Sequence, residues 1–209
     1  QTLNSTHLGA THPLGSKWML DLGLSQNFRW TGDFNNTLSW STLDTLRYHL
    51  RPQMDVGVSV GMGYDLVDPG TDMINEQLMG NLQGAFGSKF NYKVAGGLEF
   101  RQFVDTDAGT EVSPIFDASV GYELTQTTLI TAHFTEQVTP SFFNDQFTTS
   151  TVVEGSINQR LLGKFNLGLT GGYRWADYKS TLNPSEVVRK ANYEFLRVSL
   201  GARFLTRGT

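Results

Sequence analysis

Apolar and polar residues alternate with a period of two over long stretches of this chain. From Met54 to Leu66 every even position is apolar, while the odd positions carry aspartate, glycine or serine. From Lys17 to Trp30 the even positions are apolar as well, with Gln26 as the exception. Because successive side chains of a strand point to opposite faces, this pattern predicts β-strands with one apolar and one polar face.

The same alternation recurs along the whole chain and predicts ten strands. The segments are 17–30, 37–51, 54–66, 76–87, 91–103, 114–124, 127–138, 149–162, 164–178 and 193–205. The fit is poorest in the second segment, where Thr42 and Asp44 fall on the otherwise apolar face. Strands of globular proteins usually have about 5 to 6 residues, whereas tilted membrane-spanning strands need roughly 9 to 11. The lengths therefore favour a membrane protein.

Short and long connections alternate between these segments. The tight ones are 51–53, 87–90, 125–127 and 163–164, and the longer ones include 67–72, 105–110, 141–145 and 180–192. Outer-membrane barrels have short periplasmic turns and longer external loops. We therefore predict an all-β protein, a closed antiparallel transmembrane β-barrel of about ten strands over 17–205, with both termini in the periplasm. Residues 1–16 are expected to be a periplasmic tail or plug, or a strand paired elsewhere, and 206–209 a C-terminal tail.

The polar face of the predicted barrel mixes small residues with charges of both signs, which would line the lumen. The predicted lumen-lining residues are Asp21, Arg29, Arg47, His49, Asp55, Lys93, Glu99, Arg101, Asp117, Glu123, Glu154, Arg160, Arg174, Arg197 and Arg203, and Asp65 lies on the same face. Opposite charges in a narrow lumen must be paired or hydrated. The sequence leaves open whether these arginines brace the barrel or line a small pore.

The apolar face carries aromatic residues toward the strand ends, which predicts two interfacial girdles between lipid and water. The predicted girdle residues are Trp18, Trp30, Trp40, Tyr48, Tyr64, Tyr92, Tyr122, Tyr173, Trp175 and Phe204. Charge on this face is rare, with Asp44, Glu136 and Glu194 as exceptions. Aromatic packing in the core of a soluble ligand-binding β-barrel is the alternative.

Composition narrows the possible functions. Charged residues make up 17% of the 209 residues, and no apolar run reaches the roughly 18 to 20 residues of a membrane helix. The net charge of -4 and the lack of a basic stripe argue against nucleic-acid binding. Cysteine is absent, which removes disulfides and thiolate metal sites from consideration.

From about Thr37 onward the chain resembles the bacterial β-barrel porin 2 family of outer-membrane proteins. The similar stretches are 50–57 (LRPQMDVG), 97–101 (GLEFR), 122–129 (YELTQTTL), 159–164 (QRLLGK), 172–174 (GYR) with 178–180 (YKS), and 197–200 (RVSL). The resemblance implies an outer-membrane barrel, often encoded near polysaccharide-export genes, without a settled substrate. Members are usually longer, so the chain is either a reduced version or one part of a larger assembly. Many such barrels end on a phenylalanine, whereas five residues follow Phe204 here.

No sequence motif for catalysis or cofactor binding is present, and we expect neither an enzyme nor a cofactor or metal site. The prediction is a porin-like barrel with a narrow charged lumen in the bacterial outer membrane. Its expected partners are lipid, lipopolysaccharide and possible further subunits. The alternative is a structural or anchoring subunit that does not conduct. The aromatic loop 141–147 has three possible roles: a lid on the barrel mouth, a docking site, or an element inserted into the lipid interface.

Overall fold

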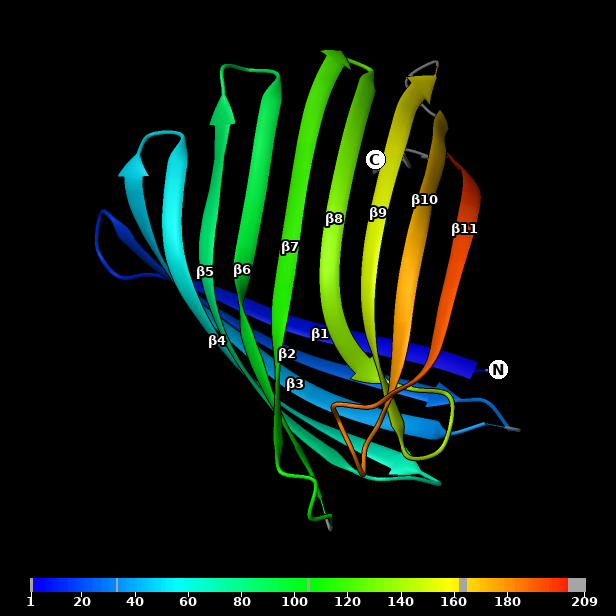
Figure 1. Ribbon diagram of the computed structural model, residues 1–209. Helices are drawn as coiled ribbons and strands as arrows, with labels where there is room; N and C mark the ends of the chain where they lie inside the picture. Colours follow the sequence, from blue (N-terminus) through cyan, green and yellow to red (C-terminus); the bar gives the residue numbers. More distant parts are fainter. Residues whose placement is uncertain (1, 33, 105, 162–164, 203–209) are drawn as a thin grey trace, which may run out of the picture.

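The computed structural model describes residues 2–32, 34–104, 106–161 and 165–202. They form one antiparallel sheet in which each strand pairs with the next along the chain (Figure 1). Its strands are β1 Thr2–Pro13, β2 Trp18–Trp30, β3 Asn36–Arg51, β4 Met54–Asp68, β5 Met73–Phe86, β6 Phe90–Phe103, β7 Thr110–Thr125, β8 Thr128–Pro140, β9 Gln146–Leu161, β10 Phe165–Ser180 and β11 Val187–Ala202.

The sheet is open, which corrects the predicted closed barrel. Within the described ranges β1 pairs only with β2, and β11 pairs only with β10, so no ladder joins the two edges. The all-β, antiparallel class is confirmed, but the closure and the count of about ten strands are wrong. With eleven strands in an up-and-down order, β1 and β11 run in the same direction. Closing the sheet on itself would therefore need a parallel pair in an otherwise antiparallel sheet.

The additional strand lies in the segment before Lys17. All twelve residues of β1 are exposed, and only Leu3 and Leu8 among them are large apolar residues. The segment lacks apolar alternation, and its place as a strand comes from the ladder with β2, which runs from the Thr2–Trp30 pair to the Pro13–Met19 pair. The odd number also places the first and last described residues at opposite ends of the sheet.

Links of two to four residues lie at one end of the sheet, and links of four to six residues lie at the other. The turn end carries the links 14–17, 52–53, 87–89 and 126–127. The loop end carries 31–35, 69–72, 104–109, 141–145 and 181–186. In Figure 1 the turn end of β5 to β11 is uppermost, and β1 to β3 run across the view at a steep angle to these later strands. The sheet is therefore strongly coiled, with one concave and one convex face.

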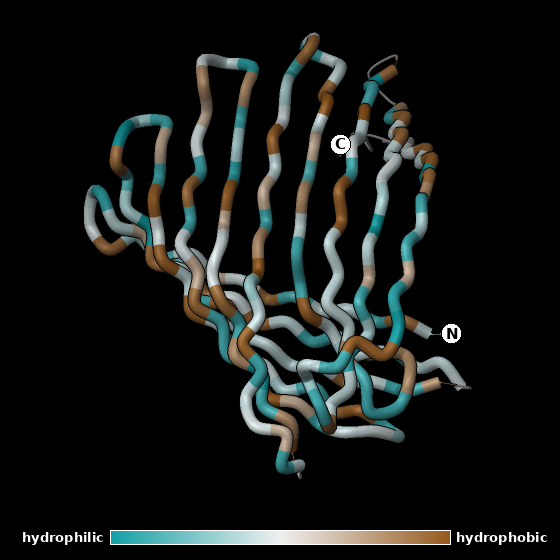
Figure 2. Tube along the Cα trace, in the orientation of Figure 1, coloured by the Kyte–Doolittle hydropathy of each residue, from teal (hydrophilic) through white to brown (hydrophobic). Residues whose placement is uncertain are grey.

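The alternation predicted from the sequence sets what each face carries, and it is visible along the rising strands in Figure 2. Odd positions of β2 to β7 point to the concave side, as the residues that line its cavity show. Strands β5 and β6 approach each other closely at Gly97 of β6, where an added Cβ would lie 1.9 Å from the carbonyl oxygen of Leu78. Only glycine fits there without displacing β5.

An apolar cluster closes the concave side at the loop end. It consists of Val67, Met73, Phe103, Val138 and Phe147, which come from the ends of β4, β5, β6, β8 and β9. Phe147 is fully buried and packs against Phe103 with 5.3 Å between the ring centroids. This cluster is the principal apolar core of the described chain, because most other large apolar side chains face outward.

Candidate functional site: the polar concave face

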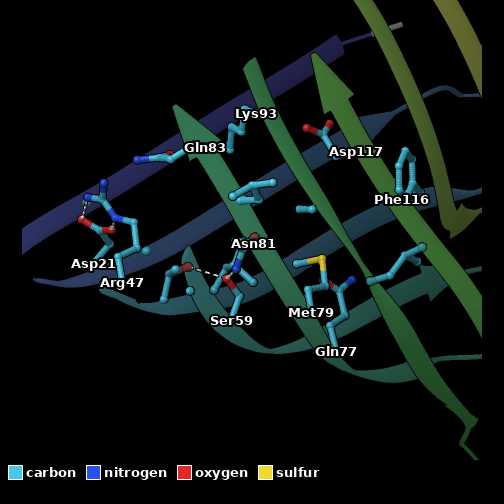
Figure 3. A pocket seen from close by; sticks show the side chains of 18 of the residues that line it. Asp21, Arg47, Ser59, Gln77, Met79, Asn81, Gln83, Lys93, Phe116 and Asp117 are labelled. Atoms are coloured by element: carbon cyan, nitrogen blue, oxygen red, sulfur yellow. Dashed lines mark hydrogen bonds and ion pairs between the residues drawn. The ribbon is translucent and has the colours of Figure 1, made fainter. Parts of the chain in front are cut away.

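The concave face forms an open cavity of about 800 Å³ that is lined by polar and apolar groups. Side chains of β1 to β8 line it, and Figure 3 shows Asp21, Arg47, Lys93 and Asp117 around the same hollow. Uncharged hydrogen-bonding groups lie between these charges, including Ser59, which accepts a hydrogen bond of 2.6 Å from Asn81 Nδ2. The cavity wall therefore offers donors, acceptors and both signs of charge to water or to a polar solute.

A charged cluster lies at the turn end of the cavity. Arg47 pairs with Asp21 through two nitrogens, and its Nη2 donates to Asp21 Oδ1 at 2.8 Å. The second carboxylate, Asp55, lies 3.6 Å from Arg47 Nη1, bonds to His49 and accepts a hydrogen bond of 3.0 Å from Gln83. Four predicted lumen residues of β2, β3 and β4 thus form one network across three strands.

A second, buried cluster lies next to the apolar core. The Arg101 guanidinium contacts Glu99 Oε1 at 2.7 Å and Asp65 Oδ2 at 3.4 Å, and donates to the Val138 carbonyl oxygen at 3.1 Å. Gln77 donates to the remaining oxygen of Glu99 at 2.7 Å. Glu99 and Arg101 are only 1% and 2% exposed. The arrangement fits cross-bracing, since nearly every polar atom is engaged inside the protein.

His133 on β8 lies between two of the predicted acidic residues. Its Nε2 is 2.8 Å from Asp117 on β7, and its Nδ1 is 3.6 Å from Glu154 on β9. All three side chains are partly exposed on the concave face. Together the three clusters extend the charged concave face from β2 to β9.

The other predicted lumen residues lie outside these clusters. Lys93 lines the cavity, and Glu123 and Arg160 are exposed near the turn end. Arg174 on β10 donates to the Tyr193 hydroxyl of β11 at 2.9 Å. Arg197, whose register partner is Thr170, makes no ion pair with a described residue. Arg203 lies outside the described residues.

The 141–145 loop crosses the loop end of the molecule. Arg29 of β2 donates to the Ser141 carbonyl oxygen at 2.9 Å and stacks over the Phe142 ring at 4.0 Å. Phe143 contacts Phe34 of the 31–35 loop and Tyr178 of β10, at 6.0 Å and 5.8 Å between centroids. A small aromatic cavity of about 350 Å³ lies between these groups. The loop thus joins the second strand to the tenth.

The convex face carries the predicted girdle aromatics that the structure describes. Trp18 and Tyr48 meet across β2 and β3 at 4.8 Å near the turn end, and Trp40 is the register partner of Tyr64 toward the loop end. Tyr173 and Trp175 meet on β10 at 4.5 Å. Trp30, Tyr92 and Tyr122 occupy outward-facing positions, and Phe204 lies outside the described residues.

Several partners in these networks were not anticipated from the sequence. Gln77, Asn81 and Gln83 are uncharged, and no charge pattern singles them out. Their odd positions within a segment of alternating residues were the available signal. His133 also lies at an odd position of an alternating segment, and its two acidic neighbours follow from the register of β7, β8 and β9.

No model of a protein family matches the chain, and no curated protein matches it, so the resemblance described above stays a prediction. Among the described residues no group of three or more histidines, cysteines or acids is arranged to hold a metal ion. The part of the chain that the structure describes contains no helix of the length and hydropathy needed to cross a membrane.

Proposed function

We propose that this chain is a membrane-embedded β-sheet protein of a bacterial outer membrane, acting as a structural or anchoring subunit of a larger assembly. One observation carries the proposal: most large side chains on the convex face are apolar and exposed. Along β4, Val58, Val60 and Met62 are 53%, 55% and 58% exposed. Exposed leucines on β3, β5, β6 and β10 extend the apolar surface: Leu46, Leu78, Leu98 and Leu169.

A soluble protein rarely tolerates such a surface. The largest apolar patch of a typical monomer covers about 300–600 Å², and larger patches mark contact with membranes or other proteins. The patch here extends over several strands and carries aromatic residues toward the turn end and the loop end of the sheet. Lipid against the convex face and water against the concave face would match the side chains that each face exposes. In this arrangement the short turns face the periplasm and the longer loops face outward.

The anchoring role is favoured over a conducting one by the closed loop end. The apolar cluster around Phe147 and the buried Arg101 network occupy the concave side there, and the 141–145 loop lies across it. A porin-like role is the second candidate, because charged side chains of both signs line part of the concave cavity. Planar-bilayer recordings separate the two roles: the anchoring subunit is silent, whereas stepwise conductance supports the porin-like role.

Spin labels on adjacent residues of β7 test the membrane proposal. Val120 points outward and Ser119 points to the concave side, and the chain has no cysteine of its own. We expect a nitroxide at Val120→Cys to be accessible to oxygen, which concentrates in lipid, after reconstitution into vesicles. A nitroxide at Ser119→Cys should respond instead to a water-soluble nickel complex.

The two labels differ by one position, so depth and local mobility are nearly matched. Equal access of the nickel complex to both labels would refute the membrane proposal. It would favour the soluble ligand-binding sheet, in which the convex face meets water or another protein.

A further inference from the structure

The two edge strands of the described sheet are long and nearly free of proline. β11 has sixteen residues and no proline, and the only proline of β1 is its last residue. Edge strands in natural proteins are usually short, interrupted by bulges or proline, or covered by another element. The register of β11 is irregular only between Val187 and Arg189, near the loop end, and its regular stretch from Arg189 to Ala202 is long enough to receive another strand.

Strand direction limits what can complete the sheet. β1 and β11 run in the same direction. Strands added between these two edges must therefore be odd in number if every neighbouring pair is to be antiparallel. A second copy of the chain would add eleven strands, an odd number, but its orientation in the membrane excludes it. In the same orientation it would offer β1 to β11 as a parallel partner, and an antiparallel β11–β11 pair would turn the second copy upside down.

The exposed side chains of β11 also indicate which residue types a partner strand would carry. Its outward residues Leu196, Val198 and Leu200 are 74%, 66% and 76% exposed, the largest values on the sheet together with Phe86 and Leu3. On the concave side of the same strand Arg197 has no ion-pair partner among the described residues. A strand beside β11 must therefore be apolar outward and polar inward, with an acid opposite Arg197.

We propose that a strand of a partner protein pairs antiparallel with the free edge of β11. Its outward residues are apolar, and an inward carboxylate faces Arg197. The inference rests on the proposed function, since a sheet edge in contact with lipid leaves its backbone N–H and C=O groups without partners. The partner strand supplies those hydrogen bonds and continues both faces of the sheet.

A synthetic copy of β2 (Trp18–Trp30) is a suitable probe strand. It has the required alternation and carries Asp21 on its polar side. Aligning Asp21 with Arg197 in an antiparallel pair places Leu20 opposite Val198. The peptide with Leu20→Cys is therefore mixed with the full chain carrying Val198→Cys, in lipid vesicles under mild oxidation. The chain with Val120→Cys is the control, because β7 has both edges occupied.

We expect the disulfide yield at Val198→Cys to exceed that at Val120→Cys by about threefold to tenfold. Replacing Asp21 of the peptide by lysine should lower the yield by a similar factor. Adding Arg197→Glu to the chain should reverse that preference. Equal yields at the two cysteines would overturn the proposal, and so would disulfide dimers of the Val198→Cys chain that exclude the peptide, since these identify a second copy as the partner.

The Val120→Cys label separates failure of this inference from failure of the proposed function. Lipid exposure at residue 120 without cross-linking at residue 198 refutes the edge pairing alone. Cross-linking at residue 198 with water exposure at residue 120 refutes the membrane proposal and leaves the edge pairing in place.

Discussion

Asp44 is a charged residue on the convex face, and its effect on stability depends on whether lipid or water contacts that face. It is exposed on β3, directly opposite Val60 of β4, and makes no ion pair with a described residue. We expect Asp44→Leu to stabilise the vesicle-embedded protein by about 1–2 kcal/mol, because a carboxylate facing lipid is costly. Urea unfolding from vesicles measures the change. Thr42→Leu on the same face is the control and should give a smaller gain, and a neutral Asp44→Leu would indicate water on this face.

Arg101 is the residue on which the buried polar cluster depends. Removing its guanidinium leaves Glu99 and Asp65 as buried carboxylates without a cation. We expect Arg101→Met to lower the free energy of unfolding by about 3–5 kcal/mol. Lys190→Ala removes an exposed ion pair with Asp177 and should change it by less than about 1 kcal/mol. Similar losses for both variants, measured by denaturant unfolding, would contradict the bracing role of Arg101.

At the scale of elements, the sequence predicts strands well where each has two different faces. β4 shows this most clearly, since Met54 to Leu66 alternates without a break and the structure places β4 at Met54–Asp68. β1 has no apolar face, so periodicity could not mark it as a strand. Pairs such as Arg47 with Asp21 require the register of β2 against β3, which alternation does not specify. The closure of the sheet depends on contacts between distant strands and was therefore predicted wrongly.

The start of β9 is the element that anchors the aromatic loop. Phe147 is fully buried between Phe103 and the other members of the apolar cluster, whereas Phe142 of the adjoining loop is 39% exposed. We expect Phe147→Ala to destabilise the protein by about 3–5 kcal/mol, as for large-to-small changes in a packed core. Phe142→Ala should cost clearly less. Thermal unfolding in detergent measures both, and equal losses would show that the cluster is not the core of the loop end.

At the scale of the whole molecule, contacts of the 141–145 loop, rather than strand ladders, connect distant strands of the coiled sheet at the loop end. The 141–145 loop receives Arg29 from β2 and contacts Tyr178 of β10 through Phe143. Thr181 N also donates to the Asp145 carbonyl oxygen at 2.8 Å. We expect these contacts to contribute to the curvature that forms the concave cavity. The curvature should therefore respond to changes far from the cavity wall.

Combining Arg29→Ala with Phe143→Ala tests this dependence. The pair removes two cation–π contacts, a hydrogen bond and two ring contacts, together worth roughly 1–3 kcal/mol. Nitroxides at Phe28→Cys on β2 and Leu182→Cys in the 181–186 loop report the distance across the loop end. We expect pulsed electron spin resonance to show a longer and broader distance distribution in the double variant. Phe86→Ala at the turn end should leave the distribution unchanged, because its ring contacts only Phe90 and Tyr92 among the described aromatic residues. An unchanged distribution in the double variant would mean that the strands hold the curvature without the loop.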